Sequence, residues 1–263
     1  MENYLVVPTP NKYVGRRRPL RLIVWHSTES SERQGAAYSV AVNWFAKASS
    51  RVSAHIVVDD GSNPRYASGV VECVNPADTA WHCGNANADG YGVEIVGKAA
   101  QSGRQWQDLY SLAAIDNACD WLLWNAALRD IPARWLTDAQ LKAGQAGHVT
   151  HAQVARVLGG STHTDPGNNF PYDRVMQLLN EPKYQDPPLA YGMRDNPVVR
   201  RVQTFLNRRY SYAKGLPATG NYLDLTVRVV KEFQARTGVT GPDANGRNIG
   251  PRTWAALRRE GYS

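Results

Sequence analysis

The hydrophobic and polar positions of this 263-residue chain follow two different periods, and these separate expected strands from expected helices. Short continuous apolar runs bounded by turn-forming residues are typical of buried strands, whereas apolar residues at every third or fourth position indicate helices. We therefore expect strands at 20–27, 53–60, 70–75 and 91–97, and helices at 35–49 and 105–128. Strands interleaved with crossover helices predict an α/β domain with one central mixed sheet flanked by helices.

The pattern changes near residue 180. Residues 181–192 carry three prolines and few apolar positions, which is typical of a linker. After it, three segments at 197–210, 223–238 and 250–261 repeat apolar residues at helical spacing. The expected organisation is a first domain at 1–180 that begins with an arm at 1–19, a linker at 181–192, and a small all-α three-helix domain at 193–263.

Composition narrows the class of protein. A hydrophobic content of 43% and a charged content of 20% are those of a soluble globular protein. No apolar run approaches about 18 residues, so we expect neither a transmembrane helix nor a stable membrane association. The first 20 residues carry a short apolar patch and then a basic cluster, the reverse of a signal peptide, so synthesis in a cytoplasm without a signal peptide is expected.

Three cysteines, none in a CxxC pair, argue against a thiolate zinc site. We expect all three to be reduced, with a Cys73–Cys83 bridge as the alternative.

The net charge of +7 is concentrated at the C-terminal end. Residues 188–263 hold 13 Lys and Arg against 5 Asp and Glu, a net charge of +8, which leaves −1 for residues 1–187. A basic module attracts nucleic acid, anionic lipid or an anionic cell wall. Because the chain has no sequence signature of a nucleic-acid-binding fold, nucleic acid is not expected as a partner.

Residues 147–171 combine three histidines with a constrained carboxylate. His148, His151 and His163 precede Asp165, and Pro166 biases that aspartate towards extended or turn geometry. Zinc binds His nitrogen and Asp oxygen, and a catalytic zinc site has three protein ligands and one open position. This stretch is expected to supply two ligands, and the best candidate for the third is His26, at the end of the apolar run at 20–27.

Five segments, in order, resemble the zinc-dependent N-acetylmuramoyl-L-alanine amidases, whose fold is shared by phage lysozyme-type amidases and peptidoglycan-recognition proteins. They are VWHST (24–28), SAHIVVDDG (53–61), AWHCGN (80–85), YGVEIVG (91–97) and THTDPG (162–167). The resemblance covers roughly residues 18–180. The C-terminal helical segments look like the peptidoglycan-binding module common on cell-wall hydrolases, with a generic helical mini-domain as the alternative.

The resemblance implies one Zn²⁺ bound by His26, a second histidine and Asp165. The family's second ligand is a histidine followed three residues later by an aliphatic residue, which favours His151 with Val154 over His148. With aspartate as the third ligand, the metal should remain a good Lewis acid.

The resemblance also implies two catalytic residues. Glu94 matches the family's general base, and its neighbours Val93 and Ile95 should point to the opposite face of the strand. The tyrosine that some relatives use as a base corresponds here to Ala54, which gives more weight to Glu94. His163 stands where many relatives carry an oxyanion-stabilising lysine, and an imidazole N–H is able to donate a hydrogen bond there.

Four further residues are implied as substrate-binding: Thr28, Trp81, His82 and Asn85. Trp44 is another aromatic residue that could stack on a sugar or peptide, although tryptophan is most often a core residue.

The expected function is hydrolysis of the amide bond between the lactyl group of N-acetylmuramic acid and L-alanine, with bacterial peptidoglycan as the partner. The chain would act as a monomeric phage endolysin in host cell lysis, made in the host cytoplasm and released to the wall by a holin-type route. The alternatives are a non-catalytic peptidoglycan-recognition protein and a bacterial cell-wall amidase.

Overall fold

The computed structural model describes residues 4–128, 130–180, 188–240 and 242–262, and the chain forms two compact units, Met1–Glu181 and Pro182–Ser263. Most of the expected linker, residues 181–187, lies outside the described residues. Its last part differs from the expectation, because Leu189–Ala190 forms strand β9 of the second unit by pairing with β10 (Asn248–Ile249).

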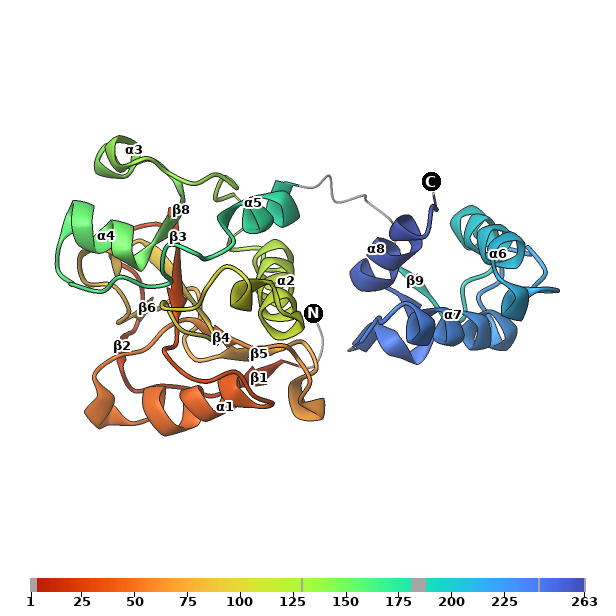
Figure 1. Ribbon diagram of the computed structural model, residues 1–263, viewed down its shortest axis with the longest axis horizontal. Helices are drawn as coiled ribbons and strands as arrows, with labels where there is room; N and C mark the ends of the chain where they lie inside the picture. The colour runs from red at the N-terminus through yellow and green to blue at the C-terminus, as the bar shows by residue number, and fades with distance from the viewer. Residues whose placement is uncertain (1–3, 129, 181–187, 241, 263) are drawn as a thin grey trace. The chain divides into compact units, whose positions relative to one another are not determined.

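The first unit is built on a six-stranded mixed sheet in the order β1-β5-β4-β7-β3-β8 (Figure 1). All neighbouring strands run parallel except β4 and β5, which are antiparallel. The strands are β1 (Leu5–Val6), β3 (Leu22–Ser27), β4 (Ile56–Val58), β5 (Val70–Glu72), β7 (Gly90–Ile95) and β8 (Gly147–Thr150). This confirms the predicted fold class, a central mixed sheet with flanking helices.

The two faces of the sheet follow the alternation of side chains along its strands. One face carries Ile23, Trp25, Val93 and Ile95, which are buried in a core with α2 (Leu109–Trp124) and α5 (Tyr172–Asn180). The opposite face is covered at its edges and carries polar side chains near its centre, so we call it the site face. Its helices are α1 (Ala36–Val40), α3 (Asp138–Lys142) and α4 (His151–Leu158).

The N-terminal segment, expected to be an arm, is part of this unit. Leu5 and Val6 pair with β5, and β2 (Lys12–Tyr13) pairs with β6 (Thr79–Ala80). The amide of Asn11 donates to the carbonyls of Phe45 and Lys47, at 3.1 and 2.8 Å.

These contacts also explain why the expected helix at 35–49 is not continuous. α1 passes into a π-helical turn at Ala41–Phe45 and then a 3-10 turn at Ala48–Ser50. The Asn11 side chain binds carbonyls that a longer α-helix would bond internally, so the segment ends in irregular turns. The expected helix at 105–128 is shorter because Asp108 caps α2, its side chain accepting from the Ser111 amide.

The second unit contains the three predicted helices, α6 (Pro197–Arg209), α7 (Asp224–Arg236) and α8 (Pro251–Arg259). Two buried glutamines make the same connection between successive helices. Each amide donates to a backbone carbonyl and a threonine hydroxyl and accepts from a glycine N–H: Gln203 with Asn221, Thr226 and Gly220, and Gln234 with Asn248, Thr253 and Gly246. The network satisfies polar groups that burial would otherwise leave unpaired.

Within the described residues, none of the helices combines the length and apolar character needed to cross a membrane. Cys73, Cys83 and Cys119 are all buried, and they form no disulfide with one another.

Candidate metal centre

Two polar side chains meet on the site face where β3 and β7 lie side by side. The strands are parallel, and their register places His26 directly opposite Glu94. Since neighbouring side chains alternate, Trp25 and Val93 point into the core while His26 and Glu94 project from the other face. The sequence therefore brings a buried imidazole and a carboxylate together by strand register alone.

Two further groups come from the segment that follows β8. Thr150 ends that strand and caps α4, its hydroxyl accepting from the Gln153 amide at 3.0 Å, so His151 is the first helical residue. The chain returns after α4 through a loop in which the carbonyl of Asp165 accepts from the Ala152 amide at 3.0 Å. This hydrogen bond holds the Asp165 loop against the first turn of α4.

His26, His151 and Asp165 converge with the spacing of a metal site. Nδ1 of His26 lies 3.0 Å from Nδ1 of His151 and 3.1 Å from Oδ2 of Asp165, and Nδ1 of His151 lies 3.2 Å from Oδ1 of Asp165. In tetrahedral zinc with bonds of about 2.0–2.1 Å, ligand atoms stand about 3.3 Å apart. The three side chains therefore fit zinc as a two-histidine, one-carboxylate set with a fourth position for substrate or water.

The second nitrogen of each histidine also has a partner. Nε2 of His26 lies 3.0 Å from Nδ1 of His82, and Nε2 of His151 lies 2.9 Å from the hydroxyl of Ser161. Histidines that bind metals almost always use their other nitrogen in such a hydrogen bond, which fixes tautomer and ring orientation. The surroundings of the three side chains thus fit a metal centre as well as the donor atoms do.

Electrostatics agree with this donor set. Burial lowers the pKa of His26, against the opposing effect of Asp165, so the imidazole favours its neutral, metal-binding form. Burial alone would raise the pKa of Asp165, but hydrogen bonds from His151 and His26 outweigh it and hold the carboxyl ionised. A neutral imidazole and an ionised carboxylate are the forms that bind zinc, and they are the forms favoured here for His26 and Asp165.

Glu94 is half-buried, and its Oε2 has no hydrogen-bond partner among the described residues. Burial raises its pKa well above the ordinary value, and the nearby carboxylates of Asp165 and Glu29 raise it further. A dication at the three-residue group would oppose that shift. An unpaired carboxylate beside such a group has the chemistry of a general base.

His163 reaches the same place from the exposed side. Its ring stacks on that of His151 with centroids 4.5 Å apart, and its Nδ1 lies 3.4 Å from Oδ1 of Asp165. Its side chain is 68% exposed, so the imidazole is open to a ligand arriving from solvent.

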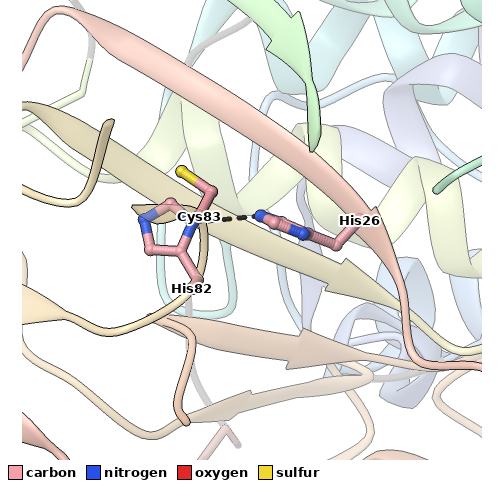
Figure 2. A group of neighbouring side chains, drawn as sticks. All are labelled: His26, His82 and Cys83. Carbon is pink, nitrogen blue, oxygen red and sulfur yellow. Dashed lines mark hydrogen bonds between the residues drawn. The ribbon is translucent and has the colours of Figure 1, made fainter. Parts of the chain in front are cut away.

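The four residues expected to bind substrate have different surroundings. Thr28 follows β3, and its hydroxyl pairs with that of Ser30. Asn85 is exposed, but its amide donates to the carbonyl of Leu158 at the end of α4. Trp81 is half-buried, with its ring 5.1 Å from that of Tyr13. His82 points at His26, as Figure 2 shows, and its Nδ1 faces the outer nitrogen of that imidazole, Nε2.

A second donor group shares His26. His26, His82 and Cys83 bring donor atoms within 4.8 Å of one another. The facing nitrogens of its two histidines are 3.0 Å apart (Figure 2), as in the first group, but its third donor is a thiol where the first group has a carboxylate. Burial raises the pKa of the Cys83 thiol well above its ordinary value, which disfavours a thiolate ligand. The group with His151 and Asp165 is therefore the better metal site.

His148, the alternative ligand, lies on the opposite face of the sheet. Its Nδ1 accepts from the indole N–H of Trp25 at 3.0 Å, and burial lowers its pKa to about 3. His55 is also a structural residue, because its Nδ1 accepts from the Gly92 amide and its ring stacks on Tyr91.

Ser161 and Asn87 were missed by sequence reasoning. Ser161 contacts His151, and the Oδ1 of Asn87 accepts from the amides of His82 and Cys83 at 3.0 and 2.7 Å. Only their positions, Ser161 directly before THTDPG (162–167) and Asn87 two residues after AWHCGN (80–85), could have drawn attention to them.

A groove of about 730 Å³ adjoins the Asn85 loop and is lined by residues that include Arg18, Arg21, Asp89 and Lys142. Neither the three donor residues nor Glu94 lines it, so the chemistry of the site does not reside there.

Comparison with known proteins gives matches for both units. A family model described as N-acetylmuramoyl-L-alanine amidase matches residues 16–168, and one described as a peptidoglycan binding domain matches residues 195–257. N-acetylmuramoyl-L-alanine amidase A of Achromobacter lyticus is 27% identical over 168 residues, covering 60% of this chain and 82% of that protein.

Among solved structures, the Staphylococcus aureus hydrolase AmiA in complex with its ligand is 24% identical, with a TM-score of 0.47 over 68% of this chain and 82% of that one. The E. coli N-acetylmuramyl-L-alanine amidase AmiD is 17% identical, with a TM-score of 0.37 over 93% of this chain and 91% of that one.

Proposed function

The chain belongs to the N-acetylmuramoyl-L-alanine amidase family, and from that premise we propose that it hydrolyses peptidoglycan with a zinc ion held by His26, His151 and Asp165. The membership makes it an enzyme of the peptidoglycan amidase class, as its motifs predicted. The scissile bond joins the lactyl group of N-acetylmuramic acid to the L-alanine of the stem peptide.

One observation carries the zinc proposal. Nitrogen and oxygen donors from β3, α4 and the loop after α4 come within 3.0 to 3.2 Å of one another. Such a cluster of buried polar side chains is costly unless its members are paired or bind an ion. The partners of the outer nitrogens support the same conclusion, because Nε2 of His26 is able to donate to His82 and Nε2 of His151 to the hydroxyl of Ser161.

When bound, zinc supplies the Lewis acidity that polarises the scissile carbonyl and lowers the pKa of water. Glu94 takes the proton from the attacking water at its unpaired oxygen and returns it to the amine of the leaving L-alanine. His163 donates an imidazole N–H to the oxygen that gains negative charge as the carbonyl is attacked. Trp81, next to His82, and Thr28, next to the end of β3, border the substrate.

Digestion of purified cell walls, followed by mass spectrometry of the fragments, tests the reaction. Intact stem peptides with free L-alanine N-termini, together with glycan strands that retain the lactyl group, are the expected products. New reducing sugar ends, or peptides cut within the stem, would instead identify a glycosidase or a peptidase.

We further propose that the second unit anchors the enzyme to the wall and that the protein serves as a phage endolysin. The match to a peptidoglycan binding domain at 195–257 and the net charge of +8 over residues 188–263 support wall attachment. Expression inside a bacterium with and without a pore-forming phage protein tests the biological role. Lysis that requires the pore supports it, and wall remodelling without lysis would favour a bacterial wall amidase.

A further inference from the structure

The site face of β7 has no side chains along most of its length. Gly90, Gly92 and Glu94 are the residues of β7 on that face, opposite Leu22, Val24 and His26 of β3. Two of the three are glycines, so the strand presents bare backbone opposite Leu22 and Val24, immediately before the His26–Glu94 pair.

The ring of His82 occupies this bare stretch. A Cβ added at Gly92 would lie 2.8 Å from both Cγ and Nδ1 of His82, closer than real Cβ contacts allow. A Cβ at Gly90 would lie 3.4 Å from Cε1 of the same ring. Gly92 does not have the positive φ that favours glycine, so its backbone would accept alanine. The missing side chain at 92 therefore provides space for the His82 ring.

The loop that carries His82 is held in place by the side chain of Asn87. The amides of His82 and Cys83 both donate to Oδ1 of Asn87. The ring meets that of His26 edge-on, with centroids 5.1 Å apart and planes at 80°, and Nδ1 of His82 faces Nε2 of His26 at 3.0 Å (Figure 2).

We propose that His82, seated on Gly92, is a positioning residue that holds His26 in the tautomer and orientation needed to bind metal. This inference rests on the proposed function, because it concerns the same metal centre. It assigns His82 to the ligand His26, where the family resemblance implied contact with substrate.

The direction of the hydrogen bond follows from the donor inventory of imidazole. A neutral imidazole has one N–H and one acceptor nitrogen. Nδ1 of His26 faces His151 and Asp165, so with zinc bound its lone pair would serve the metal and its proton would stand on Nε2. His82 would then accept at Nδ1 and carry its own proton on the buried Nε2. The ring also interacts with the backbone of Gly90, and its side-chain partner is His26.

Zinc affinity, measured on the full chain by competition with a chromophoric chelator, tests the proposal. His82→Ala is expected to weaken zinc binding by about 10- to 100-fold, the usual effect of losing such a partner. His82→Asn should recover most of that loss, because an Asn Oδ1 stands close to where the His Nδ1 stands and also accepts a hydrogen bond. The visible spectrum of the cobalt-substituted protein should change in His82→Ala and return towards wild type in His82→Asn.

Gly92→Ala provides a second, independent test of the same proposal. In the wild-type background it should weaken zinc binding by a similar factor, because the added methyl group displaces the His82 ring. In the His82→Ala background the same change should cost nothing further, since the ring it would strike is absent. A thermal unfolding scan of each variant verifies that the first unit is folded.

Equal zinc affinity in His82→Ala and wild type would overturn the proposal, and so would an equal effect of Gly92→Ala in both backgrounds. If His82→Ala does not fold, the comparison of His82→Asn with Gly92→Ala decides the matter, because only the latter should bind zinc weakly. Wild-type protein that binds no zinc or releases no stem peptides would refute the proposed function itself. Normal zinc binding and activity with no effect at position 82 would refute only the positioning role.

Discussion

Replacing Glu94 by glutamine separates its chemistry from its packing. Glutamine has nearly the same shape, and Oε2 of Glu94 has no hydrogen-bond partner among the described residues, so the substitution breaks no observed contact at that atom. It also removes a carboxyl whose pKa burial raises well above the ordinary value, so the fold loses a group that is costly to ionise. We therefore expect Glu94→Gln to bind one zinc and to unfold at or above the wild-type temperature.

Turnover should fall sharply in this variant. Loss of a general base lowers a rate by about 10²–10⁴-fold, which corresponds to about 3–5 kcal/mol of activation free energy at 1.36 kcal/mol for each factor of ten. The assay is the initial rate of stem-peptide release from solubilised wall fragments at saturating substrate, with zinc content measured on the same sample.

Glu72→Gln is the matched control, because Glu72 is another half-buried strand glutamate whose pKa burial raises, and it lies on β5 outside the donor group. The turnover of Glu72→Gln should stay within about twofold of the wild-type value, as expected for a residue that takes no part in proton transfer. Turnover of Glu94→Gln within a few-fold of wild type, at full zinc occupancy, would show that another group carries the proton.

Three further predictions follow from the same structure. Asp165→Ala should bind no zinc and release no stem peptides while the second unit still unfolds cooperatively; full zinc occupancy in this variant would remove Asp165 from the ligand set. His148→Phe should keep one zinc but lower the free energy of unfolding by about 1–3 kcal/mol, because the indole N–H of Trp25 loses its acceptor. Burial lowers the pKa of His148 to about 3 from 6.5, so the wild-type protein should lose free energy of unfolding as pH falls from about 6.5 through 3. Chemical denaturation at pH 7 and at pH 4 should show a smaller loss of that free energy in His148→Phe than in wild type. Residues 1–187 alone should cleave soluble wall fragments but bind whole walls weakly. Residues 188–263 alone should bind walls, and added salt should weaken that binding because the Debye length is only about 10 Å at 0.1 M. If residues 1–187 bound walls as tightly as the full chain, the anchoring role would be wrong.

The sequence by itself determined the fold class and the family. Continuous apolar runs and helical spacing are local signals, and they predicted the strands around His26 and Glu94 and the three C-terminal helices. Five short motifs in a fixed order were sufficient to identify the family, because each motif reflects a local constraint, such as a carboxylate in an apolar strand.

Local patterns were less reliable where distant contacts compete with helix propensity. The helix expected at 35–49 is interrupted because Asn11, more than thirty residues earlier in the chain, binds the carbonyls of Phe45 and Lys47. For the same reason, residues 1–19 could not be recognised from their own composition as part of the first unit. Their strands are defined by partners at 71–72 and 79–80.

Tertiary structure alone decided how the histidines divide between core and site. His148 and His151 are three residues apart in sequence, yet the end of β8 and the start of α4 turn them to different surroundings, one against Trp25 and the other towards His26. The meeting of His82 with His26 depends on the register of β3 and β7, which places Gly90 and Gly92 opposite Leu22 and Val24 and leaves room there for the His82 ring. Side-chain identity is encoded locally, but the distance between two side chains is fixed by strand register and loop closure, which depend on the whole chain.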